Sequence, residues 1–391
     1  MKAYLIIAVF SVWLFSCVNA GEKGNDGLKN IDFYVAEQRR IYTDELFDKV
    51  EIIPLETTPD CFLQGSPFVL GITNDYVILS NTFNNACLFD RKSGQFIHNI
   101  GKQGGGPDEY YMLSSAGNFY KEKGLIYATR GNKWIGINIE SNKVEDKVAL
   151  PDIAKDGLVV GISNPYRLND SLYIGYMNNL TGNEKYRLII FDRNGTPVKF
   201  YKNTIFFTDY KKTEADFCQG NFYYYKNDFY FYGGIFIDTI YAVKNDDLEP
   251  RYAFKLNKTR FPYEKWETPE LRLVDYTTVM DFREYDPYLL FTYRCGEFGG
   301  DAGFGVGFYD KEKNKTVLSK KEEGAIFFRD NSFPPFFIHY MDDNGYVIAH
   351  VSASEWLDFV EKYGQSIKIP EKLSNVKFDD NHILVIAHVR K

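Results

Sequence analysis

The chain has 391 residues, and its 46 Lys and Arg against 53 Asp and Glu give a formal net charge of -7. It contains no basic cluster, so its charge argues against a nucleic-acid partner. Hydrophobic residues make up 45% of the chain, which is enough for a sizeable core in two average domains or in one large repeat fold. Aromatic residues reach 17%, and because Phe and Tyr favour strands, this composition indicates a β-rich protein.

The N-terminus has the pattern of an export signal. Lys2 precedes an almost wholly apolar stretch over residues 3–15, which has the length of a signal-peptide core and is too short to span a bilayer as a helix. The LFSC sequence that follows, ending at Cys17, resembles a bacterial lipobox. We therefore expect residues 1–17 to be a signal peptide with a lipobox, and Cys17 to be the lipid anchor. Cleavage after Ala20 is the alternative, and it would discard Cys17.

The next segment is polar and then gives way to strand patterns. Residues 18–44, which include the Gly-rich GEKGNDGLKN at 21–30, are expected to form a polar tether between membrane and domain. A strand is predicted over residues 50–56. A first unit of four short strands joined by turn residues is predicted at 68–73, 76–81, 86–90 and 95–100. Further strands are predicted at 125–129, 135–139, 171–177, 187–191, 229–232, 239–243, 288–293, 306–309, 346–351 and 382–389.

One hairpin pattern recurs along these strands, in which an apolar strand ends in an acidic or polar turn and a second strand leaves it. The clearest copies span residues 87–100, 188–201 and 306–319. One supersecondary unit repeated at intervals of tens of residues indicates a repeat architecture, because a lone unit cannot bury its own apolar face. Six such units predict an all-β fold over residues 45–391, a six-bladed β-propeller of four-stranded antiparallel blades. The strand at 50–56 is expected to pair with the C-terminal blade and close the ring.

One short helical insertion is predicted in the last blade. Residues 354–363 read as a helix, and Ser352 with Glu355 has the spacing of a capping box before its apolar residues. The last blade would then be interrupted between two of its strands.

Three segments carry a family resemblance: VEIIPLETTPDCFLQG from residue 50, NIGKQGGGPDEYYML from residue 99, and the terminal FDDNHILVIAHVRK. Together they resemble the six-bladed β-propeller lipoproteins of Bacteroidetes, over roughly residues 45–391. The chain departs from that family's pattern at Asp108, where the family usually has Gly, and at His382, where it usually has Pro. The resemblance implies a propeller in the cell envelope, as an outer-membrane lipoprotein facing the periplasm or the exterior. It implies no catalytic residues.

Candidate chemistry along the chain is sparse. The Gly104–Gly106 run lacks the Lys and helix of a phosphate-binding loop and reads as a turn between blades. With no CxxC or HExxH pattern, neither a metal site nor a cofactor is expected. Removal of the signal would leave Cys61, Cys87, Cys218 and Cys295, whose wide spacing favours buried thiols over two disulfides.

A binding face is predicted from propeller topology. Blade strands alternate in direction, so the loops between second and third strands share a face with the loops between blades. The polar and aromatic side chains expected there are Asn84, Arg130, Trp134, Asn178, Arg294, Glu297 and Asp301. Amides, Arg and Trp together suit sugar or peptide recognition. Alanine at Arg130 and Trp134 would then abolish binding without changing stability.

These patterns favour a monomeric recognition module without chemistry of its own, which binds a glycan, a peptide or an envelope protein and touches the membrane only through its anchor. The alternatives are a hydrolase or lyase acting on carbohydrate through acids such as Glu297 and Asp301, which would need two carboxylates at a set separation, and a protein–protein scaffold. Convergent carboxylates in a central pocket would support the enzyme, and a large apolar patch elsewhere would support the scaffold.

Overall fold

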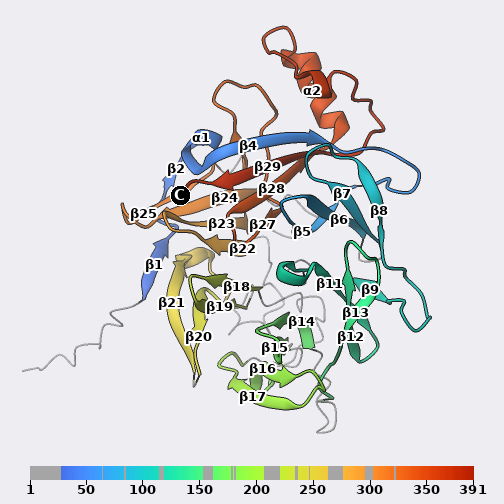
Figure 1. Cartoon of the computed structure of the whole chain (residues 1–391). Helices are drawn as coiled ribbons and strands as arrows, with labels where there is room; N and C mark the ends of the chain where they lie inside the picture. The colour runs from blue at the N-terminus through green and yellow to red at the C-terminus, as the bar shows by residue number, and fades with distance from the viewer. Residues whose placement is uncertain are drawn as a thin grey trace, which may run out of the picture.

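The structure is a computed structural model of the chain. It describes residues 28–391 except 64, 83–84, 114–118, 153–161, 178, 180–181, 207–220, 234–236, 246, 263–275, 296–302 and 321–322. The described strands form six sheets of four or five strands arranged as the blades of a ring, and a seventh sheet of two strands (Figure 1). The predicted all-β, six-bladed propeller is therefore confirmed.

Each blade is a four-stranded antiparallel sheet, apart from edge strands added by the N-terminal segment and from blade 2, whose first position is shared by two short strands. Blade 1 contains β5 (Phe68–Ile72), β6 (Tyr76–Thr82), β7 (Asn85–Asp90) and β8 (Phe96–Ile100). Blade 2 contains β9 (Met112–Leu113) and β10 (Phe119–Tyr120), which both pair with β11 (Leu125–Arg130), then β12 (Lys133–Asn138) and β13 (Val144–Ala149). Blade 3 contains β14 (Ile162–Arg167), β15 (Leu172–Met177), β16 (Tyr186–Asp192) and β17 (Pro197–Lys202).

The second half of the ring repeats this order. Blade 4 contains β18 (Asn221–Tyr225), β19 (Asp228–Tyr232), β20 (Thr239–Val243) and β21 (Leu248–Lys255). Blade 5 contains β22 (Thr277–Glu284), β23 (Tyr288–Cys295), β24 (Gly303–Asp310) and β25 (Lys315–Leu318). Blade 6 contains β27 (Tyr340–Met341), β28 (Tyr346–Val351), β29 (Ile383–Val389) and, from the other end of the chain, β4 (Phe47–Pro54).

Blade 6 closes the ring by joining the two ends of the chain. β4 pairs antiparallel with β29, from Ile383 opposite Pro54 to Val389 opposite Phe47. This satisfies the outer edge of β29 with backbone hydrogen bonds and leaves no gap between the last blade and the first. The predicted closure by the early strand is confirmed.

The core lies between blades rather than in one central mass. The described buried residues fall into six clusters, and each of them joins one pair of neighbouring blades. Middle strands are therefore covered on both faces, which explains why β15 reads as a nearly continuous apolar run (LYIGYM) with only Leu172 less than fully buried.

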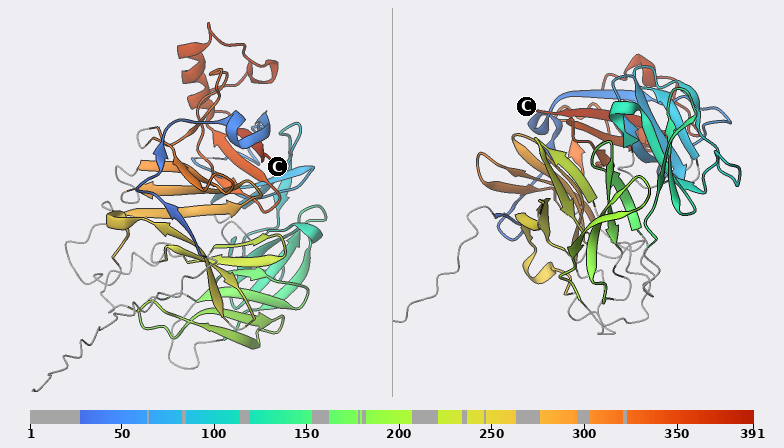
Figure 2. Two further views of the ribbon diagram at one scale, coloured as in Figure 1. Left: turned by 90° about the vertical axis from the view of Figure 1, so that its left-hand side faces the viewer. Right: turned by 60° about the horizontal axis from the view of Figure 1, so that its bottom comes forward.

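The N-terminal segment corrects the predicted tether. Residues 29–46, here called the strap, run along the outer edges of blades 4 and 5 and then pair with a short strand in the connection from blade 5 to blade 6. They contain β1 (Lys29–Asp32), β2 (Glu37–Gln38), β3 (Ile41–Tyr42) and the one-turn helix α1 (Thr43–Leu46). β1 pairs parallel with β21, β2 with β25, and β3 with β26 (Ile326–Phe327) (Figure 2). The strap belongs to the domain because it pairs with edge strands and its Ile31 and Ile41 are fully buried. Residues 1–27, with the expected signal peptide and Cys17, lie outside the described residues.

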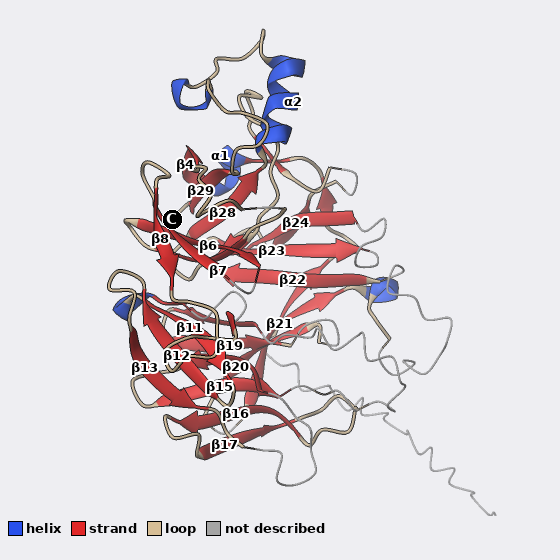
Figure 3. Ribbon diagram, turned by 90° about the vertical axis from the view of Figure 1, so that its right-hand side faces the viewer, coloured by secondary structure: helices blue, strands red, loops and turns tan. Residues whose placement is uncertain are grey.

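The predicted helical insertion is present. α2 (Ala353–Tyr363) lies between β28 and β29 and projects from the ring (Figure 3). Ser352 accepts a hydrogen bond from the Glu355 N–H, and the Glu355 side chain accepts one from the Ser352 N–H, which is the predicted capping box. Short 3-10 helices occur at Lys121–Lys123, Asn257–Thr259 and Glu371–Leu373. Among the described residues no helix is long and apolar enough to cross a membrane.

Candidate functional site

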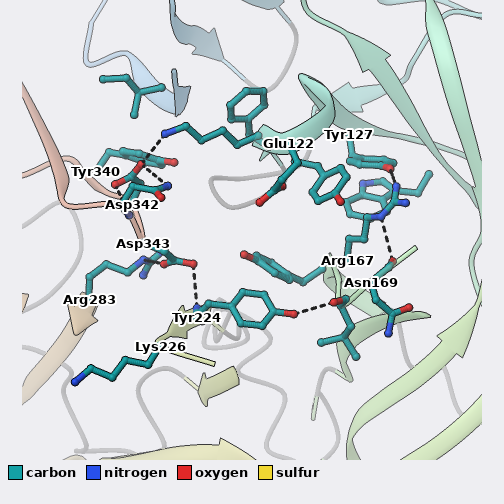
Figure 4. A pocket seen from close by; sticks show the side chains of 18 residues that line it. Glu122, Tyr127, Arg167, Asn169, Tyr224, Lys226, Arg283, Tyr340, Asp342 and Asp343 are labelled. Carbon is teal, nitrogen blue, oxygen red and sulfur yellow. Dashed lines mark hydrogen bonds and ion pairs between the residues drawn. The ribbon is translucent and has the colours of Figure 1, made fainter. Parts of the chain in front are cut away.

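The ring has two ends, which we name by their turns. The 1–2 face carries the turns between first and second strands, and the 2–3 face carries those between second and third strands. A cavity of about 560 Å³ opens at the 1–2 face, where the turns of neighbouring blades converge on the central channel (Figure 4). Every blade contributes to its wall, from Ile72 in blade 1 to Asn344 in blade 6. The described structure thus has its central cavity at the face opposite to the predicted one.

The turn of blade 6 projects two adjacent carboxylates into this cavity. Asp342 shapes the turn, because its Oδ1 accepts hydrogen bonds from the N–H groups of Asn344 (2.9 Å) and Tyr346 (2.8 Å). Asp343 is directed across the channel, where its Oδ2 accepts a hydrogen bond from the Tyr224 N–H of blade 4 at 2.9 Å. The other oxygen, Oδ1, lies 3.1 Å from the Nε of Arg283 in blade 5. One side chain therefore joins three blades.

Burial dominates the electrostatics of Asp343. It raises the pKa of this carboxyl to about 6, and the nearby Asp342 and Asp281 act in the same direction against Arg283 and the Tyr224 N–H. The side chain is nevertheless 24% exposed, because it faces the cavity. Asp343 thus contacts three blades, is accessible from the cavity and has a pKa of about 6.

Tyrosines supply much of the remaining wall. Tyr166 and Tyr224 lie side by side, with ring centroids 6.1 Å apart, and the Tyr224 hydroxyl donates to the Leu168 carbonyl at 3.0 Å. Burial raises the pKa of Tyr224 to about 12, with Asp343 and Glu122 adding to the effect. The phenol of Tyr224 therefore stays neutral, and because its single proton is donated to Leu168, its oxygen can only accept a hydrogen bond from a ligand.

The cations that the structure describes in the wall are each paired with a carboxylate. Arg167 donates to Asp170 Oδ1 at 2.7 Å and to Asp146 Oδ2 at 3.3 Å. Lys121 of blade 2 reaches to 3.6 Å from Asp342, and Lys226 lies 3.0 Å from Asp286. These ion pairs, together with the pairing of Arg283 with Asp281 (2.9 Å), fix the cavity wall.

Several of the predicted site residues cannot be placed. Asn84, Asn178, Glu297 and Asp301 lie outside the described residues. The carboxylate pair on which the enzyme alternative was built is thus not located, and the binding role of these four residues stays a prediction.

Trp134 corrects the prediction of an exposed stacking platform. Its side chain is 1% exposed, its ring stacks on Tyr127 at 3.9 Å, and Tyr173 meets it edge-on at 6.1 Å. It is packed between blades 2 and 3 and is buried, although it borders the cavity. A side chain packed in this way cannot stack on a ligand at the 2–3 face.

Arg130 and Arg294 do lie toward the 2–3 face, but in supporting positions. Arg130 donates to the carbonyls of Glu109 (2.9 Å) and Gly105 (3.3 Å) and so holds the glycine-rich loop, while Arg294 is 8% exposed. The loop has its own anion, because the Gly106 N–H donates to Glu109 Oε2 at 2.7 Å. This supports the reading of Gly104–Gly106 as a turn, since a carboxylate of the chain already fills the position of a bound phosphate.

Three of the five histidines gather toward the 2–3 face in blade 6. His339 stacks on His350 with centroids 3.7 Å apart, and His382 meets His350 edge-on at 4.8 Å. Burial, with the two neighbouring imidazoles, holds the pKa of His350 far below its usual range. Across the described part of the chain, no group of His, Cys, Asp and Glu has an arrangement that could hold a metal ion. The three cysteines that are described, Cys61, Cys87 and Cys295, are unbridged.

Sequence reasoning found the turns of this cavity but not its residues. Asn169-Asp170, Asn227-Asp228 and Asn344-Gly345 are all turn signals, and each marks a 1–2 turn at or beside the cavity. The residues just before each turn signal, such as Tyr166 and Tyr224, were not predicted to belong to the site, although their position marks them. First strands run along the channel, so the residues at their ends form its mouth.

The fold of this chain is similar to those of known protein structures. No curated protein matches the chain. The crystal structure of a candidate exported protein from Bacteroides fragilis aligns with a TM-score of 0.68 at 18% identity, covering 93% of this chain and 100% of that one. A member of the DUF4221 family from Bacteroides vulgatus aligns with a TM-score of 0.51 at 12% identity, covering 88% of this chain and 98% of that one. The family described as Domain of unknown function (DUF4934) matches residues 28–388, and the chain belongs to that family.

Proposed function

We propose that this propeller is a recognition module without chemistry of its own, and that it binds a glycan, a peptide or an envelope protein partner through the cavity at the 1–2 face. The observation that carries the proposal is the convergence of all six blades on one cavity whose wall mixes tyrosine rings, carboxylates and amides. Ligand sites are concave, and a few fixed polar groups among aromatic walls give them specificity.

The wall is suited to binding because it is held rigid before a ligand arrives. Asp343 ties blades 4, 5 and 6 together, and Lys121 ties blade 2 to the turn of blade 6. Preorganised groups lose little conformational entropy when a ligand binds. This favours recognition by the ring as a whole over recognition by one mobile loop.

Catalysis is the second candidate, because a carboxyl with a pKa near 6 in a cavity is a general-acid signature. The contacts weigh against it. Asp342 is occupied in shaping its turn, and both oxygens of Asp343 have partners that favour the ionised form. A general acid must give up its proton to a substrate, whereas these groups support the wall.

Export with a lipid on Cys17 is part of the proposal. It is supported by the signal-like residues 1–17, and the described B. fragilis structure with a similar fold is that of a candidate exported protein. Metabolic labelling with a clickable fatty acid tests it, since a Cys17→Ser chain should lose the label that the natural chain carries.

The function is tested with the soluble domain from residue 28 on glycan and peptide arrays, followed by mass spectrometry of the ligands that bind. Saturable binding with ligand mass unchanged is the expected result. A shortened or altered ligand would contradict the proposal and make the protein an enzyme, with Asp343 the first residue to replace.

A further inference from the structure

The cavity has one charge that the described protein leaves unbalanced. Each of the four cations among its described wall residues lies within 3.6 Å of a carboxylate. Glu122, in contrast, makes no hydrogen bond or ion pair with any part of the chain that the structure describes, and its side chain is exposed. Figure 4 shows it projecting into the open cavity toward the side on which Tyr224 lies.

Tyr120, Tyr166 and Tyr224 line the same cavity as Glu122, and the Arg167 guanidinium covers one face of Tyr120 at 4.4 Å. Tyr120 and Glu122 both lie close enough to act electrostatically on the Tyr224 hydroxyl, and Tyr166 lies next to Tyr224. Ring faces attract cations, most of all where little water intervenes. A carboxylate beside tyrosine faces is therefore a site for a positive group.

The rest of the wall favours a side chain over a sugar. Ile72 and Phe119 add apolar surface, and the arginine and lysine donors are already engaged with carboxylates. A sugar ring needs many donors and acceptors for its hydroxyls. A lysine or arginine side chain instead lays an apolar stem against such walls and presents its charge at the end.

We propose that the cavity takes a basic side chain, Lys or Arg, of an extended polypeptide, with Glu122 as its charge partner and the tyrosine faces around it. This proposal specifies the class of ligand that the recognition module binds, and it depends on the function proposed above. The partner is then a polypeptide rather than a glycan.

Short capped peptides test the idea directly by isothermal titration calorimetry. Acetyl-Gly-Lys-Gly-amide and its Arg counterpart should bind about tenfold more tightly than the norleucine and citrulline peptides of the same shape. Glucosamine against glucose forms a separate arm. Discrimination in that arm alone would overturn the assignment to a polypeptide.

A matched pair of substitutions locates the effect. Glu122→Gln should remove the preference for Lys over norleucine. Glu312→Gln should keep it, because Glu312 is also an exposed Glu between two lysines but lies outside the cavity. Glu122 lies in a short exposed 3-10 helix and Glu312 in an exposed turn, so folding should survive in each variant, and circular dichroism checks this.

The two proposals can fail separately. Suppose that array ligands bind, that Lys and norleucine peptides bind equally tightly, and that Glu122→Gln changes neither affinity. The proposal of a basic ligand side chain is then wrong, while the proposed recognition function is retained. If no ligand binds the natural domain at all, the proposed function itself fails.

Discussion

Single side chains in this ring serve blade packing first. Trp134 shows this most plainly, since it is sandwiched between Tyr127 of its own blade and Tyr173 of the next. Tyr127 in turn donates to Asp146, which also pairs with Arg167 of blade 3. An aromatic stack and an ion-pair network therefore fix the same interface between blades 2 and 3.

Alanine at Arg130 and Trp134 together should lower stability rather than abolish binding. Loss of a buried Trp side chain leaves a cavity and costs about 3–5 kcal/mol of unfolding free energy. Urea denaturation measures this cost, and Trp134→Phe should recover a large part of it. An unchanged midpoint with lost ligand binding would contradict the burial of Trp134.

His350 predicts a dependence of stability on pH. Because its pKa is lowered in the folded state, the unfolded chain binds a proton that the folded chain does not. The stability is thus fully present above the unfolded pKa of about 6.5 and falls as the pH falls below it. Between pH 7.5 and 5.5 one such histidine should cost about 1.4 kcal/mol. A His350→Phe chain should lose that much less in urea unfolding over this range, and equal slopes would contradict the buried neutral imidazole.

At the scale of elements, the strap is the least expected feature. Its strands β2 and β3 have two residues each, too few for any period to be read from the sequence. Their pairing depends on the edges of β25 and β26, which lie nearly 300 residues away along the chain.

Most central strands were predictable to within a residue or two, because apolar runs bounded by Asn, Asp and Gly mark them; β15 and β28 are examples. The capping box of α2 was predictable for the same reason, since its signal is local.

Truncation separates a strap from a tether. A chain beginning at residue 28 should unfold at the same temperature as a longer one, whereas a chain beginning at residue 45 should be several degrees less stable. The loss follows from the buried Ile31 and Ile41 and from the uncovered edges of blades 4 and 5. Differential scanning calorimetry of the two chains measures this difference. Equal unfolding midpoints would support the prediction of a tether.

The junction between blades 6 and 1 depends on Gly94. Its φ is +76°, and a Cβ there would lie 2.1 Å from the Pro54 carbonyl oxygen at the end of β4. Gly94→Ala should therefore destabilise the ring closure by about 1–3 kcal/mol, through backbone strain and displacement of β4. Gly105→Ala is the matched control, because it has open space around it and an ordinary φ. If the two variants had the same midpoint in urea, β4 would not pack as described.

On the scale of the whole molecule, six blades with a separate core at each interface enclose one central channel. The fold follows from repetition of one unit and could be read from the sequence. The site could not, because it is assembled from the ends of first strands in different blades, and which side chain faces the channel depends on how the blades are tilted around the axis. Asp343 is an example, since its contacts in blades 4 and 5 come from residues 60 to 119 positions earlier in the chain.

The most direct test of the cavity at the 1–2 face is one array experiment run in parallel on three proteins: the natural domain, Asn344→Trp and Asn194→Trp. The two asparagines occupy equivalent turns, Asp-Asp-Asn-Gly and Asp-Arg-Asn-Gly, and each N–H donates to the Asp two residues earlier. Only Asn344 borders the cavity. A bulky ring there should abolish binding while Asn194→Trp leaves it unchanged. Equal binding by all three proteins would contradict a binding site at the 1–2 face and would favour the 2–3 face instead.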